Sequence, residues 1–367
     1  MGTILSRKRK DGTIGHTAVI RIKKKGKVVH TESETFDRKQ AAEAWLKKRE
    51  TALAEPGALE KREDPTLKAV IDQYNLEKLR EHGRTKAQVL KTISASDLGS
   101  KRCSEITAPD LVAYIQSLTM KDGAAPSPST RQNYLSHLTS VFKVARPAWG
   151  YPLDWQAAAD ARVVLTKLGH IGRSKERDRR PTLDELDQLM KFYGQTYRRR
   201  LDAIPMQKLI CFAIFSTRRQ EEISTVLRED LDAEHHELLV RDMKNPGETI
   251  GNLVRTTLTP QALQLIFAHG AEQGEIWPYN CKSVSRSFTQ ACKFLGIEDL
   301  VFHDLRHDGI SRLFEMGWTI PQVAAVSGHR TWESLKRYTH VKQRGDKYAD
   351  WPWLTKVLAL PRGEKSA

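Results

Sequence analysis

Five side chains in the second half of the sequence are of types that together could handle a phosphate. They are two arginines, two histidines and a tyrosine: Arg219, Arg306, His303, His329 and Tyr338. Guanidinium forks and imidazole N–H groups suit the nonbridging oxygens of a phosphodiester. A tyrosine hydroxyl can attack the phosphorus, and fixed cations then stabilise the negative charge of the transition state. The residue types therefore indicate nucleophilic chemistry on a phosphodiester.

Each of these residues lies in a short motif that is common on its own. The motifs are R-x-x-E at Arg219–Glu222, H-x-x-R at His303–Arg306, a Gly-His pair ending at His329, and Tyr338 nine residues later. An arginine with a glutamate three positions on is by itself most simply an ion pair on one helical face. A single histidine or tyrosine is usually a packing residue. The functional indication comes from the order and spacing of the whole set.

The elements that must position these residues are predicted to be helices with one hairpin. Residues 182–185 have the pattern of a capping box that opens a helix, and the apolar run 209–215 fits a buried helix that ends before the first arginine. Two short apolar segments within residues 237–258 flank Asn245-Pro246-Gly247, which predicts a β-hairpin with a longer loop. Residues 259–345 return to helical patterns.

The N-terminal end of the sequence is strongly basic. Residues 1–50 carry 14 Lys and Arg against 6 Asp and Glu. Short β segments at 18–22 and 27–31, followed by a helical stretch at 36–50, predict a small sheet packed on one helix. A flexible basic tail is the alternative interpretation of the same residues.

Two polar breaks divide the rest of the chain. The first, at residues 55–65, interrupts the hydrophobic periodicity. Helical patterns then run from 66 to 160, with Ser129 as the expected N-cap of one helix. A second break at residues 172–181 is polar and basic, so we expect a linker there.

The amino-acid composition limits the kinds of molecule that the protein is expected to bind. A formal charge of +15 and a pI near 9.6 favour a polyanion such as nucleic acid, although a merely solubilising surface or an acidic membrane would also fit. The four cysteines show no C-x-x-C pairing, so neither a zinc site nor a dense disulfide framework is indicated. No apolar run approaches the length of a membrane span or follows a signal-peptide pattern. We therefore expect a cytoplasmic protein.

Taken in order, the motifs resemble the signature of the tyrosine recombinase, or phage integrase, family across residues 182–340. Residues 127–145 resemble the family's core-binding helices, and residues 1–50 resemble its small arm-site DNA-binding sheet. The resemblance implies a multidomain, mainly α fold with small β elements. Its parts would be an arm-type DNA-binding-like sheet domain at 1–55, a helical, SAM-like core-binding domain at 66–160, an α+β catalytic domain at 175–345, and a C-terminal tail at 346–367.

The resemblance also implies a role for each site residue. Tyr338 would be the nucleophile that forms a 3′-phosphotyrosyl intermediate, and Lys244 on the predicted hairpin would be the general acid for the leaving 5′ oxygen. His303 would be a general base and phosphate contact, and Glu222 would orient the arginines. The remaining members would bind the phosphate oxygens: Arg219, Arg306 and His329. No metal or other cofactor is implied.

Three nearby residues are less closely tied to the family pattern. His307 and Arg337 fit either a structural role or a contact to the DNA backbone. Thr217 stands two positions before the first arginine, where the family often has glycine. Threonine does not easily adopt the positive φ that is open to glycine.

The resemblance implies double-stranded DNA attachment sites as partners, a homotetramer on DNA, and accessory DNA-bending or directionality factors. The expected function is site-specific integration and excision of a mobile genetic element such as a viral genome. The apolar tail fits docking on a neighbouring subunit or packing on its own domain. Alternatives are a DNA invertase of the shufflon type, a catalytically silent DNA-binding protein of the same fold, and a metal-dependent nuclease or transposase.

Overall fold

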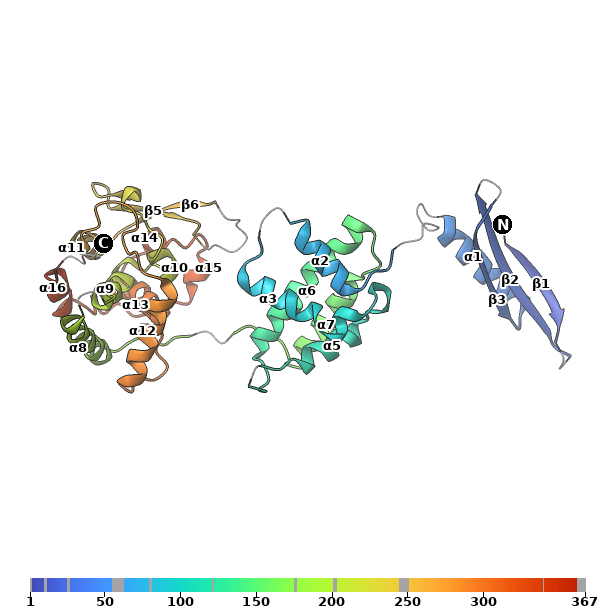
Figure 1. Cartoon of the computed structure of the whole chain (residues 1–367), viewed down its shortest axis with the longest axis horizontal. Coiled ribbons are helices and arrows are strands. Elements are labelled where there is room, and N and C mark those ends of the chain that lie inside the picture. Colours follow the sequence, from blue (N-terminus) through green and yellow to red (C-terminus); the bar gives the residue numbers. More distant parts are fainter. Residues whose placement is uncertain are drawn as a thin grey trace. The chain divides into compact units, whose positions relative to one another are not determined.

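The computed structural model divides into two compact units, residues 1–175 and 176–367. Figure 1 labels their helices and strands along the chain. The structure describes residues 2–9, 12–24, 27–54, 63–78, 81–120, 122–174, 177–200, 203–243, 251–338 and 340–361. Each unit has its own hydrophobic core. Among these residues, none of the helices combines the length and apolar character that crossing a membrane requires.

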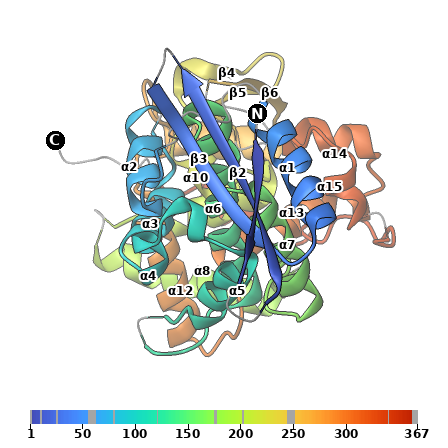
Figure 2. The ribbon, with the colours of Figure 1, turned by 90° about the vertical axis from the view of Figure 1, so that its right-hand side faces the viewer.

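The first unit begins with a three-stranded antiparallel sheet. Its strands are β1 (Thr3–Lys8), β2 (Ile14–Lys24) and β3 (Lys27–Phe36), in the order β1-β2-β3, and α1 (Lys39–Ala54) packs on one face (Figure 2). Ala18 and Ile20 alternate along β2 toward that helix and are buried. The predicted segments at 18–22 and 27–31 lie in β2 and β3. The edge strand β1 was not predicted, because it is largely exposed and lacks an apolar face.

Six α-helices follow among the described residues of the first unit. They are α2 (Leu67–Leu76), α3 (Arg84–Ser94), α4 (Asp97–Ser100), α5 (Ala108–Ser117), α6 (Pro128–Trp149) and α7 (Trp155–Lys167). The prediction that Ser129 caps a helix is wrong by two residues. Ser127 is the N-cap of α6, its hydroxyl accepts from the Thr130 backbone N–H, and Pro128 takes the first helical position, where its missing N–H costs nothing.

The second unit is mainly helical with one small sheet. Its helices are α8 (Leu183–Arg199), α9 (Met206–Ser216), α10 (Gln220–Ile223), α11 (Pro260–His269), α12 (Cys281–Phe294), α13 (Phe302–Glu315), α14 (Ile320–Ser327), α15 (Glu333–Lys336) and α16 (Trp353–Leu358). The capping box predicted at 182–185 opens α8. The sheet contains the predicted hairpin, β5 (Glu237–Arg241) with β6 (Leu253–Thr257), and adds the two-residue strand β4 (Leu231–Asp232).

Helices α9 and α13 cross closely in the core of the second unit. A side-chain carbon added at Gly309 on α13 would lie 2.1 Å from the Ile214 carbonyl oxygen on α9. Only glycine permits this approach. The crossing sets the separation between the end of α9, which precedes the first arginine motif, and the H-x-x-R segment on α13.

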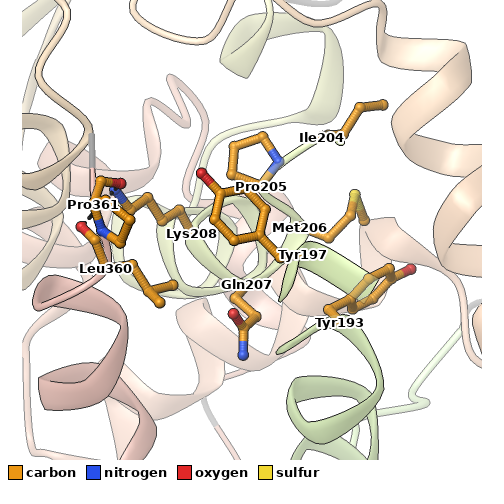
Figure 3. Close-up of a pocket in the computed structure, with 9 residues that line it drawn as sticks. All are labelled: Tyr193, Tyr197, Ile204, Pro205, Met206, Gln207, Lys208, Leu360 and Pro361. Atoms are coloured by element: carbon orange, nitrogen blue, oxygen red, sulfur yellow. Dashed lines mark hydrogen bonds between the residues drawn. The ribbon is translucent and has the colours of Figure 1, made fainter. Parts of the chain in front are cut away.

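The C-terminal segment packs on its own unit in this chain. Val357 on α16 is fully buried, and Trp351 donates from its indole N–H to Asp187 at 3.1 Å. Lys208 extends toward the segment (Figure 3), and its ammonium donates to the carbonyls of Leu360 and Pro361 at 3.3 and 2.9 Å. Burial lowers the pKa of Lys208 to about 8. Docking on a neighbouring subunit stays a prediction.

Candidate active site

The first arginine motif follows a turn with an uncommon backbone conformation. Helix α9 ends at Ser216, and Thr217 is left-handed with φ of 56°. Thr217 therefore adopts the glycine-like conformation that its residue type disfavours. Such strain costs on the order of 1–3 kcal/mol and persists only where the surroundings enforce it. Here Thr217 is fully buried, and its carbonyl accepts a hydrogen bond from the guanidinium of Arg306.

The carboxylate of Glu222, on α10, lies close to the guanidinium groups of three arginines. Its carboxylate accepts from the Arg219 side chain at 2.6 Å and from the Arg219 backbone N–H at 3.0 Å. The same carboxylate lies 3.8 Å from guanidinium nitrogens of Arg218 and Arg306. Arg306 also donates to the Ser327 carbonyl at 3.0 Å. The two predicted arginines, distant in sequence, are thus brought to one carboxylate.

We call Arg218, Arg219, Glu222 and Arg306 the arginine cluster. In the part of the chain that the structure describes, it sets three guanidiniums against a single carboxylate. Burial and the nearby Arg219 charge lower the pKa of Arg306 to about 9. Burial alone would raise the pKa of Glu222, but the arginines outweigh it and the pKa is lowered. An anion would relieve the repulsion among the guanidiniums, so the cluster is suited to bind a phosphate.

His329 adjoins the arginine cluster just beyond the end of α14. Its Nε2 lies 3.3 Å from the Arg306 guanidinium, and its Nδ1 lies 2.7 Å from the Ser327 hydroxyl. Burial and the charges of Arg306 and Arg219 lower the pKa of His329 to about 3, so its imidazole is neutral near pH 7. Among the described residues, no group of three or more His, Cys, Asp or Glu side chains is arranged to hold a metal ion.

Lys244 lies outside the described residues, but its neighbour is firmly placed. Met243 is buried, and its carbonyl accepts from the Asn252 side chain at 2.8 Å. Gly328 has a φ of 71°, and a side-chain carbon there would lie 2.7 Å from the Met243 methyl carbon. Met243 therefore packs against the turn that precedes His329, and the positive φ of that turn favours glycine at 328.

Tyr338 lies in the turn after α15 and is mostly buried. Its hydroxyl is hydrogen-bonded to Nδ1 of His307 on α13. Its ring stacks on Phe314 with centroids 6.2 Å apart, and the Arg337 guanidinium lies 5.4 Å from its ring centroid. Tyr338 also raises the pKa of Arg306, so the phenol and the arginine cluster are within electrostatic reach. The structure thus places His307 directly against the expected nucleophile.

His303 lies one helical turn before His307 on α13, at the exposed edge of the site. The two rings meet edge to face with centroids 4.9 Å apart. Partial desolvation by surrounding protein atoms and the charges of Arg306 and Arg219 lower the pKa of His303. His303 is therefore part of the same electrostatic group as the arginines.

Sequence reasoning missed or left open three residues of this region. Arg218 was given no role, although it directly follows a buried apolar helix, a position that signals burial. His307 was left open, because H-x-x-R-H places it next to Arg306 without showing which way it points. Arg337 donates to the Asp178 carboxylate at 3.0 Å and to a neighbouring carbonyl, contacts within its own unit.

Several known proteins are similar to this chain. Residues 179–344 match the model of the phage integrase family. A shufflon-specific DNA recombinase of Escherichia coli is 28% identical over 247 residues, which are 66% of this chain and 60% of that protein. The chain thus spans less than two thirds of that relative's length. Tyrosine recombinase XerC of Corynebacterium glutamicum is 32% identical over 65 residues, 18% of this chain and 21% of that protein.

Solved structures of integrases share the fold. A lambda integrase dimer bound to a COC' core site has a TM-score of 0.54 at 20% identity, covering 78% of this chain and 98% of that chain. The Tn1549 transposon integrase in complex with a circular intermediate DNA has a TM-score of 0.54 at 13% identity, covering 74% and 94%. The predicted fold class, mainly α with small β elements, is confirmed. The part of this chain at residues 179–344, which matches the family model, therefore belongs to the phage integrase (tyrosine recombinase) family.

Proposed function

We propose that this chain is a site-specific DNA recombinase that cleaves and rejoins strands through a 3′-phosphotyrosyl intermediate on Tyr338. The observation that carries the proposal is the arginine cluster, an excess of buried positive charge within electrostatic reach of the Tyr338 hydroxyl. Fixed cations in a site shielded from water stabilise the charge that develops on phosphorus. This excess of cations suits a phosphate or a similar oxyanion, and a neutral substrate group would not need it.

Each phosphate-binding role follows from a side chain's environment. Arg219 keeps 24% of its side chain exposed and can present its guanidinium to a nonbridging oxygen. Arg306 is held by two backbone carbonyls, so its fork is fixed before DNA arrives. His329 and His303 supply further contacts, and Glu222 orients the arginines.

Lys244 is the proposed general acid for the leaving 5′ oxygen. Met243, the residue before it, packs against Gly328, which directly precedes His329. A lysine is an effective acid near neutral pH when neighbouring positive charge lowers its pKa. In cleavage the Tyr338 oxygen bonds to phosphorus, the bond from phosphorus to the 5′ oxygen breaks, and that oxygen takes the acid's proton. A 5′ hydroxyl of a second strand then reverses the step without metal or ATP.

Double-stranded DNA attachment sites are the proposed partners, and three parts of the chain would share the binding. The sheet face away from α1 carries Arg7, Thr17, Arg21 and Thr35 by strand alternation and register, and it would contact arm-type sites. We propose residues 1–55, 66–160 and 175–345 as arm-binding, core-binding and catalytic domains. A homotetramer on DNA and accessory DNA-bending or directionality factors complete the proposal.

Integration and excision of a mobile element is the main proposed outcome of the reaction. DNA inversion is a second candidate, favoured by the likeness to the shufflon-specific recombinase. Recombination of paired sites on one plasmid in direct or inverted order, and of sites on two plasmids, would separate them. An integrase should join two plasmids and delete between direct repeats, whereas an invertase should act on inverted sites alone.

The central test is covalent capture. The protein is incubated in EDTA with a library of nicked duplexes made from flanking genomic DNA, and adducts that survive SDS are recovered and sequenced. We expect adducts from the wild type and none from Tyr338→Phe. Tyr197→Phe is the matched control, because Tyr197 lines the pocket beside the C-terminal segment (Figure 3), and it should form adducts normally. Adducts from Tyr338→Phe at the wild-type level would remove Tyr338 from its role.

A further inference from the structure

The Tyr338 hydroxyl has a hydrogen-bond partner that neither composition nor motif spacing identified. His307 reaches it from α13, and Nδ1 is the bonded atom. The two rings are tilted by 33° with centroids 6.1 Å apart, so the imidazole edge, not its face, meets the hydroxyl. Phe314 stacks on the phenol ring and Arg337 lies over it. The phenol is thus held by its ring while its oxygen points at a basic nitrogen.

We propose that His307 is the base that takes the proton from Tyr338 as its oxygen attacks phosphorus. The proposal rests on the proposed function and adds a catalytic residue to it. In the step, the bond from the Tyr338 oxygen to phosphorus forms while the phenolic proton moves to His307 Nδ1. The bond from phosphorus to the 5′ oxygen breaks, and that oxygen is protonated by the separate acid, Lys244. Religation reverses both transfers, with His307 returning its proton to the phenolate.

The surroundings favour His307 over His303 for this task. His307 makes the hydrogen bond to the reacting oxygen, whereas the His303 ring meets the His307 ring edge to face with centroids 4.9 Å apart. A base must be within hydrogen-bond reach of the proton that it takes. His303 therefore keeps its phosphate contact and loses the general-base role.

The charge state of His307 fits a proton acceptor. Burial, His303, Arg337 and Arg306 lower its pKa to about 4, while Asp304 raises it, so the ring is neutral near pH 7. A neutral imidazole has one nitrogen free of hydrogen, and the bonded Nδ1 can be that nitrogen. A bound phosphodiester adds negative charge next to the ring and would raise its pKa toward the range of an effective base.

The test separates the two proton transfers by changing the leaving group. The substrate is the duplex recovered in the capture experiment, made with either oxygen or sulfur as the 5′ bridging atom at the cleaved phosphate. A thiolate leaves without a proton, so the sulfur substrate needs no general acid. We expect Lys244→Ala to be slow with oxygen and rescued with sulfur. His307→Ala should be slower than the wild type by about 10²–10⁴ with both substrates in single-turnover adduct formation.

Two further measurements distinguish a base from a residue that only positions the phenol. His307→Asn keeps an acceptor atom near the place of Nδ1 but takes no proton, and it should remain as slow as His307→Ala. The rate deficit of both variants relative to the wild type should shrink roughly tenfold per pH unit up to about pH 9. A phenol ionises near pH 10, and the ionised phenol needs no base. Duplex affinity and unfolding midpoints of the variants check that they fold.

Three results would overturn the assignment. Near wild-type rates for His307→Asn, a deficit that does not change with pH, or rescue of His307→Ala by the sulfur substrate would each show that His307 is no proton acceptor for Tyr338. Absence of adducts from the wild type on both substrates would instead overturn the proposed function, and the His307 assignment with it. The two failures are therefore distinguishable.

Discussion

Helix α13 contributes to two charged clusters that differ in their balance. The arginine cluster holds three guanidiniums around Glu222. The second, which we call the balanced cluster, pairs three cations with three anions among the described residues: Arg180, Arg312 and Lys347 with Asp308, Glu315 and Asp346. Its distances are those of close ion pairs, 2.7 Å for Arg180 to Asp308 and 2.6 Å for Arg312 to Asp346. Both clusters bury charge, but only one neutralises it.

This difference in charge balance distinguishes a binding site, the arginine cluster, from a cluster that stabilises the fold. In the balanced cluster, Asp308 accepts from Arg180 before α8, from Lys347 after α15 and from the Tyr348 hydroxyl, so one carboxylate ties three segments together. Buried charges that are mutually paired hold such segments in place. The arginine cluster is left with positive charge that its own carboxylate does not match. An oxyanion is the complement that it lacks.

Loss of the central carboxylate should give the largest effect on stability. Asp308→Ala removes a fully buried carboxylate, so that Lys347 loses its ion-pair partner and Arg180 keeps Glu315 alone, and we expect a loss of about 3–5 kcal/mol in the free energy of unfolding. Urea denaturation measures it. Asp178→Asn is the control, since Asp178 pairs with Arg337 at the surface and should cost at most about 1 kcal/mol. Equal losses of unfolding free energy in the two variants would contradict the distinction between the balanced cluster and a surface ion pair.

The same substitution made in both clusters should separate catalysis from structure. Arg306→Lys keeps the charge but loses the planar fork, and cleavage should fall by about 10²–10³, or roughly 3–4 kcal/mol of transition-state stabilisation. Arg312→Lys should lower the unfolding midpoint but leave the cleavage rate per folded molecule within about threefold of the wild type. Adduct formation and thermal unfolding give the two readouts. Similar losses of cleavage rate in Arg306→Lys and Arg312→Lys would contradict the assignment of catalysis to the arginine cluster and of stability to the balanced cluster.

Acid should weaken the fold through the neutral histidines of the site. The pKa values of His329 and His307 are lowered to about 3 and about 4 in the folded protein, whereas an unfolded histidine titrates near 6.5. Between these values the unfolded state binds more protons, so stability is retained above pH 6.5 and falls as pH decreases toward 4. Urea midpoints at pH 7, 6 and 5 measure the slope. His307→Asn should reduce this slope.

An oxyanion should give the smallest effect, a modest stabilisation. Vanadate or sulfate at about ten times its dissociation constant would add about 1.4 kcal/mol to the free energy of unfolding if it binds the folded site alone. Sodium chloride of equal ionic strength should not reproduce the rise in melting temperature. Arg219→Ala should abolish it, and Arg180→Ala should weaken the protein but retain the rise. A rise that survives Arg219→Ala would place the anion elsewhere.

The sequence predicted the members of the site better than their surroundings. Tyr338 and Arg306 were proposed as site residues because their motifs occur in a fixed order, and the helix α9 was predicted because its apolar run is uninterrupted. Motif spacing could not show that His307 turns toward Tyr338, since this depends on the rotation of α13 in its packing. Thr217 shows the limit of local propensity: its contacts with Arg306 and the buried core outweigh the preference of threonine for negative φ. Asp308 went unnoticed because its partners lie about 40 and 130 positions away.

Lys208 sets a condition on any rearrangement of the C-terminal segment. The ammonium is buried and donates to carbonyls at Ala268, Leu360 and Pro361. A segment that leaves would remove two of these three acceptors, and a buried charge without acceptors is costly. In an assembly, departure of one segment would therefore require the arrival of an equivalent one with two free carbonyls. If subunits exchanged this C-terminal segment, each Lys208 would regain its two carbonyl acceptors only from the segment of another subunit. Every subunit that gave up its segment would therefore have to receive one.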